Sequence, residues 1–163
     1  MSSSDTLILE TTQGTVTVAM RPDLAPQHVA RIKELVREGF YDGLLWHRVI
    51  DGFMAQTGDP DGDGTGGSGQ KIPAEFNAGK HVRGAVSMAR AANVNSADSQ
   101  FFIVLDDSQF LDGQYTYWGE VVSGMEFVDR IRKGDSDDNG MVAEPDRIVR
   151  IQVAADADNA AKK

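Results

Sequence analysis

Eight short runs rich in apolar and β-branched residues constrain the fold of this chain more than any other feature. They cover residues 7–9, 16–20, 44–49, 53–57, 85–89, 100–105, 117–122 and 147–153. Runs of this length and composition are typical of β-strands. Most of them are joined by turns rather than by helices, so we predict an antiparallel barrel or sandwich instead of an alternating α/β fold.

Two segments have the spacing of amphipathic helices. The first begins at Pro26, which suits the opening turn of a helix, and ends at Gly39. The second begins with Ser123 and Glu126, which have the spacing of a capping box, and ends at Gly134. We expect both helices to cover the core of the sheet.

The length of 163 residues fits one domain, which we place at residues 6–153 between flexible ends at residues 1–5 and 154–163. The net charge of −9 argues against nucleic acid or an anionic membrane as the main partner. The chain has no cysteine, which excludes disulfide bonds and thiol catalysis. It shows neither a signal peptide nor a membrane-spanning run, so we expect a cytoplasmic protein, and nothing demands more than a monomer.

The glycine-rich segment 58–69 fits two other kinds of site in part. Gly62, Gly64 and Gly67 have the G-x-G-x-x-G spacing of a dinucleotide site, but no helix is expected to follow them. Three aspartates have the spacing of an EF-hand calcium loop, in which the twelfth position should be glutamate but is Gln70 here (Asp59, Asp61 and Asp63). We prefer an ordered glycine loop and keep a calcium-binding module as an alternative.

The histidines and serines do not form a conventional catalytic constellation. His28, His47 and His81 lack metal-ligand spacings, and no serine lies in a nucleophile elbow. An enzyme with this sequence would work without nucleophile, metal, cofactor or proton relay. Rotation about the amide bond before proline fits that description, because its barrier of about 18–20 kcal/mol falls when the nitrogen lone pair is localised, and no covalent bond has to break.

A predicted hairpin supplies a group that can localise this lone pair. An Asp51-Gly52 turn joins the runs 44–49 and 53–57, and the first run carries Arg48. A guanidinium that donates a hydrogen bond to the prolyl nitrogen favours the twisted state over the planar ones. Apolar walls for the pyrrolidine ring are available nearby in Phe53, Met54 and Phe102.

At these residues the sequence closely resembles the cyclophilin family of peptidyl-prolyl cis/trans isomerases, particularly its bacterial cytoplasmic members. The matching segments follow one another over most of the chain at residues 41–43, 46–59, 64–67, 74–77, 87–89, 99–103 and 110–113. The resemblance implies a mainly β fold, a closed eight-stranded antiparallel β-barrel capped by two α-helices. It also implies a cofactor-free isomerase that acts on Xaa-Pro bonds in proline-containing peptides and unfolded protein chains and so assists folding.

The resemblance assigns the site residue by residue. It implies that Arg48 is the catalytic arginine and Gln56 its polar helper, and that the proline pocket is formed by Phe53, Met54, Phe102 and Leu111. Contacts with the peptide backbone fall on Ala89, Arg90 and Ala91, with Gln100 beside them and Gly64 at the edge. Tyr115 replaces a histidine that often borders the pocket, and Phe110 replaces a tryptophan. Phe110 has no indole N–H, so cyclosporin binding is expected to be weak.

A proline-binding chaperone or adaptor with the same groove and little catalysis stays open as an alternative function. Arg48 favours the enzyme, because binding in a groove does not by itself require a cation at the prolyl nitrogen. The client proteins and the preferred residue before proline do not follow from the sequence.

Overall fold

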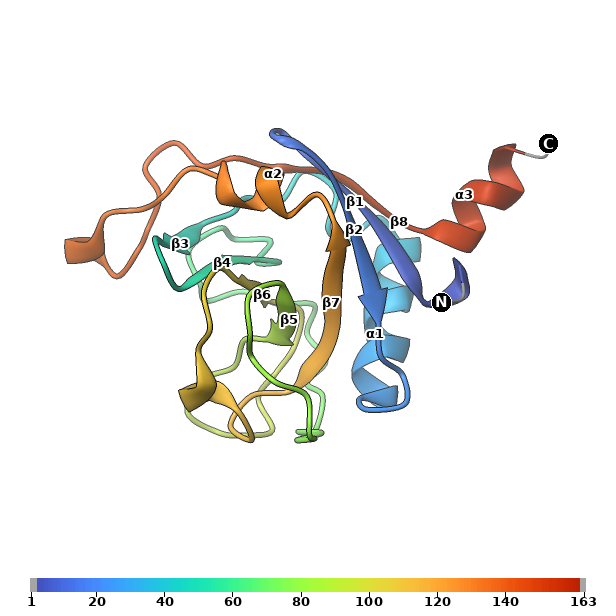
Figure 1. Ribbon diagram of the computed structural model, residues 1–163, viewed down its shortest axis with the longest axis horizontal. Helices are drawn as coiled ribbons and strands as arrows, with labels where there is room; N and C mark the ends of the chain where they lie inside the picture. The colour runs from blue at the N-terminus through green and yellow to red at the C-terminus, as the bar shows by residue number, and fades with distance from the viewer. Residues whose placement is uncertain (1–2, 162–163) are drawn as a thin grey trace.

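Eight antiparallel strands form one curled sheet in the computed structural model, which describes residues 3–161 (Figure 1). The strands are β1 (Thr6–Thr11), β2 (Gly14–Met20), β3 (Arg48–Ile50), β4 (Met54–Thr57), β5 (Ala85–Met88), β6 (Phe101–Val104), β7 (Tyr117–Ser123) and β8 (Ile148–Val153). Their order in the sheet is β3-β4-β6-β5-β7-β2-β1-β8. The mainly β class and all eight predicted strands are confirmed, although β3 is shorter than predicted.

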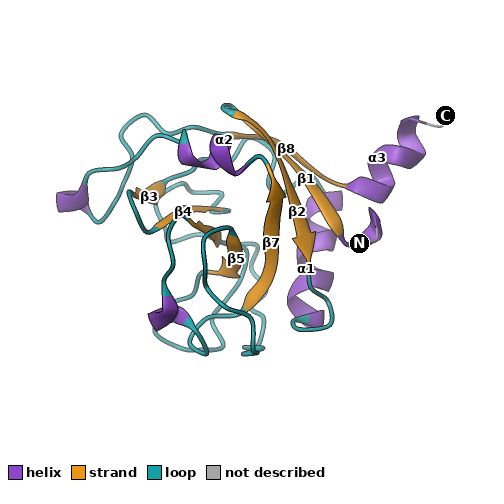
Figure 2. Cartoon of the chain, in the orientation of Figure 1, coloured by secondary structure: helices purple, strands orange, loops and turns teal. Residues whose placement is uncertain are grey.

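Three α-helices accompany the sheet (Figure 2). α1 (Pro26–Arg37) begins at Pro26 as predicted and buries one apolar face. α2 (Met125–Asp129) is shorter than predicted, and the predicted capping box is wrong, because Ser123 still belongs to β7 and Gly124 caps the helix with a φ of 89°. Short 3-10 helices are η1 (Ser3–Asp5), η2 (Gln109–Leu111) and η3 (Ser136–Asp138).

The third helix, α3 (Ala154–Ala161), continues directly from β8 into the segment that we predicted to be a flexible tail. An ion pair joins it to α1, with Arg37 Nε 3.0 Å from Asp156 Oδ2. Near the N-terminus of the chain, Asp5 of η1 accepts a hydrogen bond from Lys33 Nζ of α1 at 2.9 Å. The ends that we predicted to be flexible include helical turns at residues 3–5 and 154–161, and their flexibility stays a prediction. Residues 1–2 and 162–163 lie outside the described residues.

The sheet is open and curled rather than the closed barrel that we expected. β3 and β8 end the strand order and do not pair with each other. The chain just before β3 does contact the start of β8, through the isolated bridge Leu45↔Arg147 and the bond from Ile148 N to Leu44 O at 2.8 Å. The irregular chain between α2 and β8 runs between these edges instead. It bonds to β3, with Gly134 N donating to Val49 O at 2.8 Å and Val49 N donating to Gly140 O at 2.9 Å. These contacts use the edge of β3 that a closed barrel would pair with β8.

Alternation along β6 divides the apolar core in two. Phe101 and Ile103 point into the larger cluster, which α1 covers, and Phe102 and Val104 point into a smaller one. The smaller cluster also holds Met54 of β4 and Leu111 of η2. Within the described residues, no helix combines the length and apolar character needed to cross a membrane.

Candidate active site

The β3–β4 hairpin holds Arg48 directly opposite Gln56. Their Cα atoms are partners in the ladder, and Arg48 Nη1 donates to Gln56 Oε1 at 3.1 Å. The next pair, Val49 and Ala55, is fully buried, so alternation turns Arg48 and Gln56 to the other face of the hairpin. The positive φ of Gly52, 73°, provides the turn that brings the two strands into this register.

The guanidinium of Arg48 is held from a second side by Asn139. Arg48 Nε donates to the Asn139 carbonyl oxygen at 2.9 Å, and Nη2 donates to Asn139 Oδ1 at 3.2 Å. With the bond to Gln56, three of the five N–H donors of a guanidinium are used within the described residues, which leaves one N–H on each Nη atom. Burial lowers the pKa of Arg48 from its ordinary value, but an arginine remains charged at any physiological pH.

Asn139 is a site residue that the sequence analysis missed. Among the residues that the structure describes, it is the only one other than glycine with a positive φ, which is 55°. Asparagine tolerates this left-handed conformation better than most residues, and such backbone outliers gather at functional sites. The Asn139-Gly140 pair is a turn signal in the sequence, but a turn signal does not show which distant side chain the turn will hold.

A line of amide groups continues from Gln56 to the glycine loop. Gln56 Nε2 donates to Gln100 Oε1 at 2.8 Å, and Gln100 Nε2 donates to the carbonyl oxygens of Gly64 and Gly66, both at 3.0 Å. Each amide therefore gives its N–H to the next acceptor, which leaves the Gln56 oxygen to face Arg48. This arrangement fixes both glutamine side chains and ties the glycine loop to β4 and β6.

Next to Arg48 is a cavity of about 210 Å³. It is lined by Arg48, Phe53, Met54, Gln56, Ala89, Arg90, Phe102, Phe110, Leu111 and Tyr115. Its floor is buried, with Met54 2%, Phe102 5% and Leu111 5% exposed, whereas Phe110 on the rim is 71% exposed. The rings of Phe53 and Phe110 lie 5.6 Å apart, and Tyr115 meets Phe102 edge-on at 5.9 Å. The cavity thus has apolar walls and a cation at one side.

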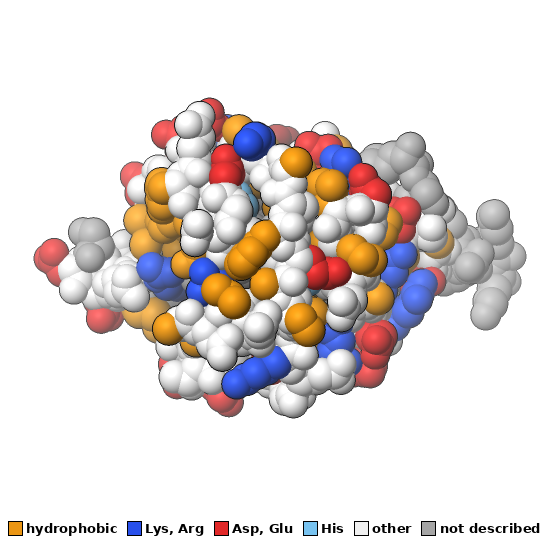
Figure 3. Space-filling view, turned by 90° about the horizontal axis from the view of Figure 1, so that it is seen from below, with side chains coloured by type: hydrophobic (Ala, Val, Ile, Leu, Met, Phe, Trp, Pro, Cys, Tyr) orange, Lys and Arg blue, Asp and Glu red, His pale blue; other side chains and the backbone are white. Residues whose placement is uncertain are grey.

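A second pocket of about 350 Å³ adjoins this cavity. The two share Gln56, Ala89 and Arg90, and the second pocket adds the remaining residues of the predicted site, namely Gly64, Ala91 and Gln100. The structure therefore brings all thirteen predicted residues to one continuous groove. Figure 3 shows basic side chains adjoining hydrophobic ones on one face of the molecule.

A buried polar group supports the floor of the cavity. His81 is stacked against Phe102 with ring centroids 6.3 Å apart, and its Nδ1 lies 2.9 Å from Asp112 Oδ1 while its Nε2 lies 2.8 Å from Ser87 Oγ. His81 and Ser87 are buried, so no substrate can reach this Ser-His-Asp arrangement. Burial lowers the pKa of His81 and so favours the neutral form of the ring, although Asp112 opposes this shift. We did not foresee this support, because only the fold brings these residues behind Phe102.

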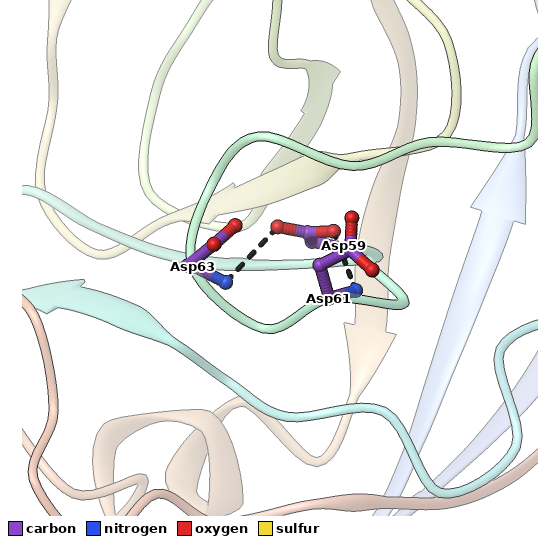
Figure 4. Close-up of side chains that lie close together, drawn as sticks. All are labelled: Asp59, Asp61 and Asp63. Atoms are coloured by element: carbon purple, nitrogen blue, oxygen red, sulfur yellow. Dashed lines mark hydrogen bonds between the residues drawn. The ribbon is translucent and has the colours of Figure 1, made fainter.

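The three aspartates of the glycine loop lie close together (Figure 4). Asp59 is 1% exposed and turns inward, and its carboxylate accepts hydrogen bonds from the backbone of Asp61 at 2.8 Å, Asp63 at 3.1 Å and Gly64 at 2.5 Å. Burial opposes the charge, but these bonds outweigh it and hold the pKa of Asp59 below its usual value. β4 precedes the loop and no helix follows it before β5, so the loop lacks the frame of an EF-hand and of a dinucleotide site.

Comparison with known proteins places this chain in a family. Residues 6–153 match the family described as cyclophilin type peptidyl-prolyl cis-trans isomerase/CLD. The chain belongs to the cyclophilin family. It is 54% identical over 164 residues to a protein of Brucella suis named "Probable peptidyl-prolyl cis-trans isomerase", with 93% of this chain and 84% of the relative covered. It is 41% identical to a peptidyl-prolyl cis-trans isomerase of Synechococcus elongatus, with 92% of this chain and 97% of the relative covered.

Solved structures agree with this assignment. Cyclophilin AquaCyp293 from Hirschia baltica superposes with a TM-score of 0.86 at 28% identity and covers 96% of this chain and 76% of its own. A Cryptosporidium parvum cyclophilin-type isomerase, whose crystal structure was determined in the presence of the dipeptide Ala-Pro, has a TM-score of 0.84 at 28% identity and covers 91% of this chain and 98% of its own. This cyclophilin is accordingly a peptidyl-prolyl cis-trans isomerase, as the resemblance predicted.

Proposed function

We propose that this cyclophilin rotates Xaa-Pro bonds by donating a hydrogen bond from Arg48 to the prolyl nitrogen while the proline ring sits in the adjoining cavity. The observation that supports this proposal most directly is the position of Arg48, which lines the apolar cavity and keeps two N–H groups free of partners in the described chain. The crystal structure of the Cryptosporidium parvum isomerase in the presence of the dipeptide Ala-Pro supports a proline-containing peptide as the ligand.

The rate enhancement comes from stabilising the twisted state of the Xaa-Pro bond more than its planar states. In a planar imide the nitrogen lone pair is delocalised into the carbonyl group, and the nitrogen is a poor hydrogen-bond acceptor. When the bond twists, the lone pair becomes localised and can accept an N–H from Arg48. A hydrogen bond that forms only in the twisted state lowers the barrier without tightening ground-state binding. A preorganised donor of this kind contributes roughly 2.7–4 kcal/mol in other enzymes.

The other groove residues would hold the substrate while this happens. Met54, Phe102 and Leu111 form a floor that can keep the ring still, so that the carbonyl group before the proline is the part that turns. Gln56 orients Arg48, and residues 89–91 line the second pocket, where an extended peptide can run on from the cavity. Phe110 offers no N–H at the rim, so we also propose that cyclosporin binds weakly.

Exchange NMR with an Ala-Pro peptide and isotope-labelled protein tests the proposal. We expect faster cis/trans exchange of the peptide, together with shift changes that are concentrated on the residues of the cavity and the second pocket. Shift changes in the groove without faster exchange would support the adaptor alternative instead. Faster exchange with shift changes on another face would show that the groove is not the site. The cytoplasmic location, the monomeric state and the protein-folding role stay predictions.

A further inference from the structure

Most arginines of this acidic chain are neutralised by carboxylates. Six of the ten pair with an aspartate or glutamate within 4.0 Å, namely Arg21, Arg31, Arg37, Arg83, Arg132 and Arg150. Of the four with no ion pair among the described residues, two line the candidate cavity, Arg48 and Arg90. The groove thus holds guanidinium charge that the protein itself does not neutralise, in a chain whose net charge is −9.

Arg90 is fixed at the junction of the cavity and the second pocket. Its Nε and Nη2 both donate to the carbonyl oxygen of Gln114, at 3.1 and 2.8 Å, and its Nη1 donates to the carbonyl oxygen of Ala91 at 2.9 Å. Its Cζ atom lies 4.7 Å from the centre of the Tyr115 ring. All these partners are formally neutral, so they orient the guanidinium and leave its charge in place.

The acidic groups around the groove are already engaged. Asp98, which lines the second pocket, accepts bonds from Ser68 N and Ser68 Oγ, both at 2.6 Å, and from Gly69 N at 3.1 Å. The same pocket also holds Lys71, whose charge is of opposite sign to that of Asp98. No carboxylate lines the cavity itself among the described residues. The unopposed positive charge is therefore at the proline cavity and its junction, rather than deeper in the second pocket.

We propose that this groove prefers substrates that carry an acidic side chain within two residues of the proline, with Arg90 as the residue that recognises it. This inference rests on the proposed function, because it assumes that the proline occupies the cavity. A peptide whose proline lies there and whose neighbouring residues enter the second pocket must pass Arg90, which both pockets share. A carboxylate at that point meets a guanidinium that forms no ion pair within the described chain.

A peptide panel tests this preference. Glu, Gln or Lys is placed in turn at each of the two positions before and the two positions after a single proline, and kcat/KM is measured by exchange NMR at about 0.1 M salt, where charges more than about 10 Å apart are largely screened. We expect Glu to exceed Gln by about fivefold at one or more positions, and Lys to fall below Gln there. The advantage should shrink to less than about twofold at 1 M salt.

Arg90→Gln should remove the preference for Glu, and Arg90→Lys should retain part of it. Arg130→Gln is the matched control, because it changes the net charge equally and Arg130 lies outside both pockets and has no ion pair in the described chain. Equal kcat/KM for Glu, Gln and Lys at every position, or a preference that Arg90→Gln and Arg130→Gln reduce alike, would overturn the inference. The Gln peptide separates the two proposals. If the wild-type protein does not accelerate cis/trans exchange of the Gln peptide, the proposed function itself is wrong.

Discussion

Arg48 and Gln56 are partners in the β3–β4 ladder, and the register of that ladder sets their side chains 3.1 Å apart. The contact therefore depends on backbone pairing within one hairpin rather than on the placement of a loop. Asn139 holds the same guanidinium from the opposite direction, through a segment 91 residues away in sequence. The contact with Gln56 is local and the contact with Asn139 is distant in sequence, so the two can be removed by separate substitutions with different expected effects.

Asn139→Gly tests the contact between Asn139 and Arg48. Glycine adopts the positive φ of this position and retains the carbonyl oxygen that accepts from Arg48 Nε, but it removes Oδ1. We expect kcat to fall by roughly threefold to tenfold with a smaller change in KM, because losing one hydrogen bond costs about 0.5–1.5 kcal/mol. Steady-state kinetics on a neutral Ala-Pro peptide gives both constants.

Asn139→Ala is the matched comparison, because alanine also removes Oδ1 and in addition disfavours the positive φ by roughly 1–2 kcal/mol. We expect a lower thermal midpoint than for Asn139→Gly and a larger loss of kcat. If both variants retain the wild-type kcat, Asn139 does not position Arg48 for catalysis.

Phe53→Ala removes one wall of the proline cavity. Phe53 is only partly buried and packs on the exposed Phe110 ring, so we expect its loss to raise KM severalfold while the free energy of unfolding changes little. Phe102→Ala should differ, because Phe102 is 5% exposed and its removal should cost about 3–5 kcal/mol of stability. Kinetics and urea unfolding of the two variants check this contrast. An unchanged KM for a folded Phe53→Ala protein would show that the ring does not contact the substrate.

The buried histidines make stability depend on pH. Burial lowers the pKa values of His28, His47 and His81, so each binds a proton more readily in the unfolded chain, where its pKa is about 6.5. The unfolded state therefore gains protons first as the pH falls below about 7, and the free energy of unfolding decreases until the folded-state pKa values are passed. We expect the thermal midpoint to fall between about pH 7.5 and 5.5.

His47 is the cleanest of the three to test, because it has no ion-pair partner among the described residues, whereas His28 pairs with Glu75 and His81 with Asp112. His47→Gln removes the titration without introducing a charge. Its thermal midpoint should depend less steeply on pH over this interval than that of wild type, whatever its absolute value. A slope equal to the wild-type slope would show that His47 does not contribute.

Local sequence patterns were enough to predict the strands, because each strand is a short run rich in apolar and β-branched residues. They were not enough for the ends of some elements. Residues 44–47 were predicted to extend β3, but they pair with distant irregular chain, where Trp46 N donates to Asp146 O at 2.9 Å. Another non-local contact, of Val49 with Gly134 and Gly140, occupies the free edge of β3 and leaves the sheet open. No local pattern shows that a segment 100 residues away will occupy a strand edge.

In the candidate site, too, some features could be predicted from the sequence and others could not. The hairpin was predicted from its local pattern, whereas the role of Gln56 beside Arg48 and the cavity walls came from resemblance to a family. Asn139, the support of Phe102 by His81, and the neutral partners of Arg90 were not predictable, because each joins segments that only the folded chain brings together. The acidic glycine loop carried the strongest misleading motifs in the sequence, and the structure uses Asp59 there to bind the loop's own backbone.

Stabilisation of the twisted imide by Arg48 is tested by exchange NMR on a neutral Ala-Pro peptide, with the variants Arg48→Ala and Arg48→Lys and the control Arg130→Ala. Arg48→Ala should lose about 2.7–4 kcal/mol of transition-state stabilisation, which is on the order of a hundredfold to a thousandfold in rate. Arg48→Lys should recover little of it. The three bonds that Arg48 makes to Gln56 and Asn139 would use all three N–H groups of an ammonium and leave none for the prolyl nitrogen. Arg130→Ala should exchange the peptide as fast as wild type. A folded Arg48→Ala protein that keeps the wild-type rate would contradict the account.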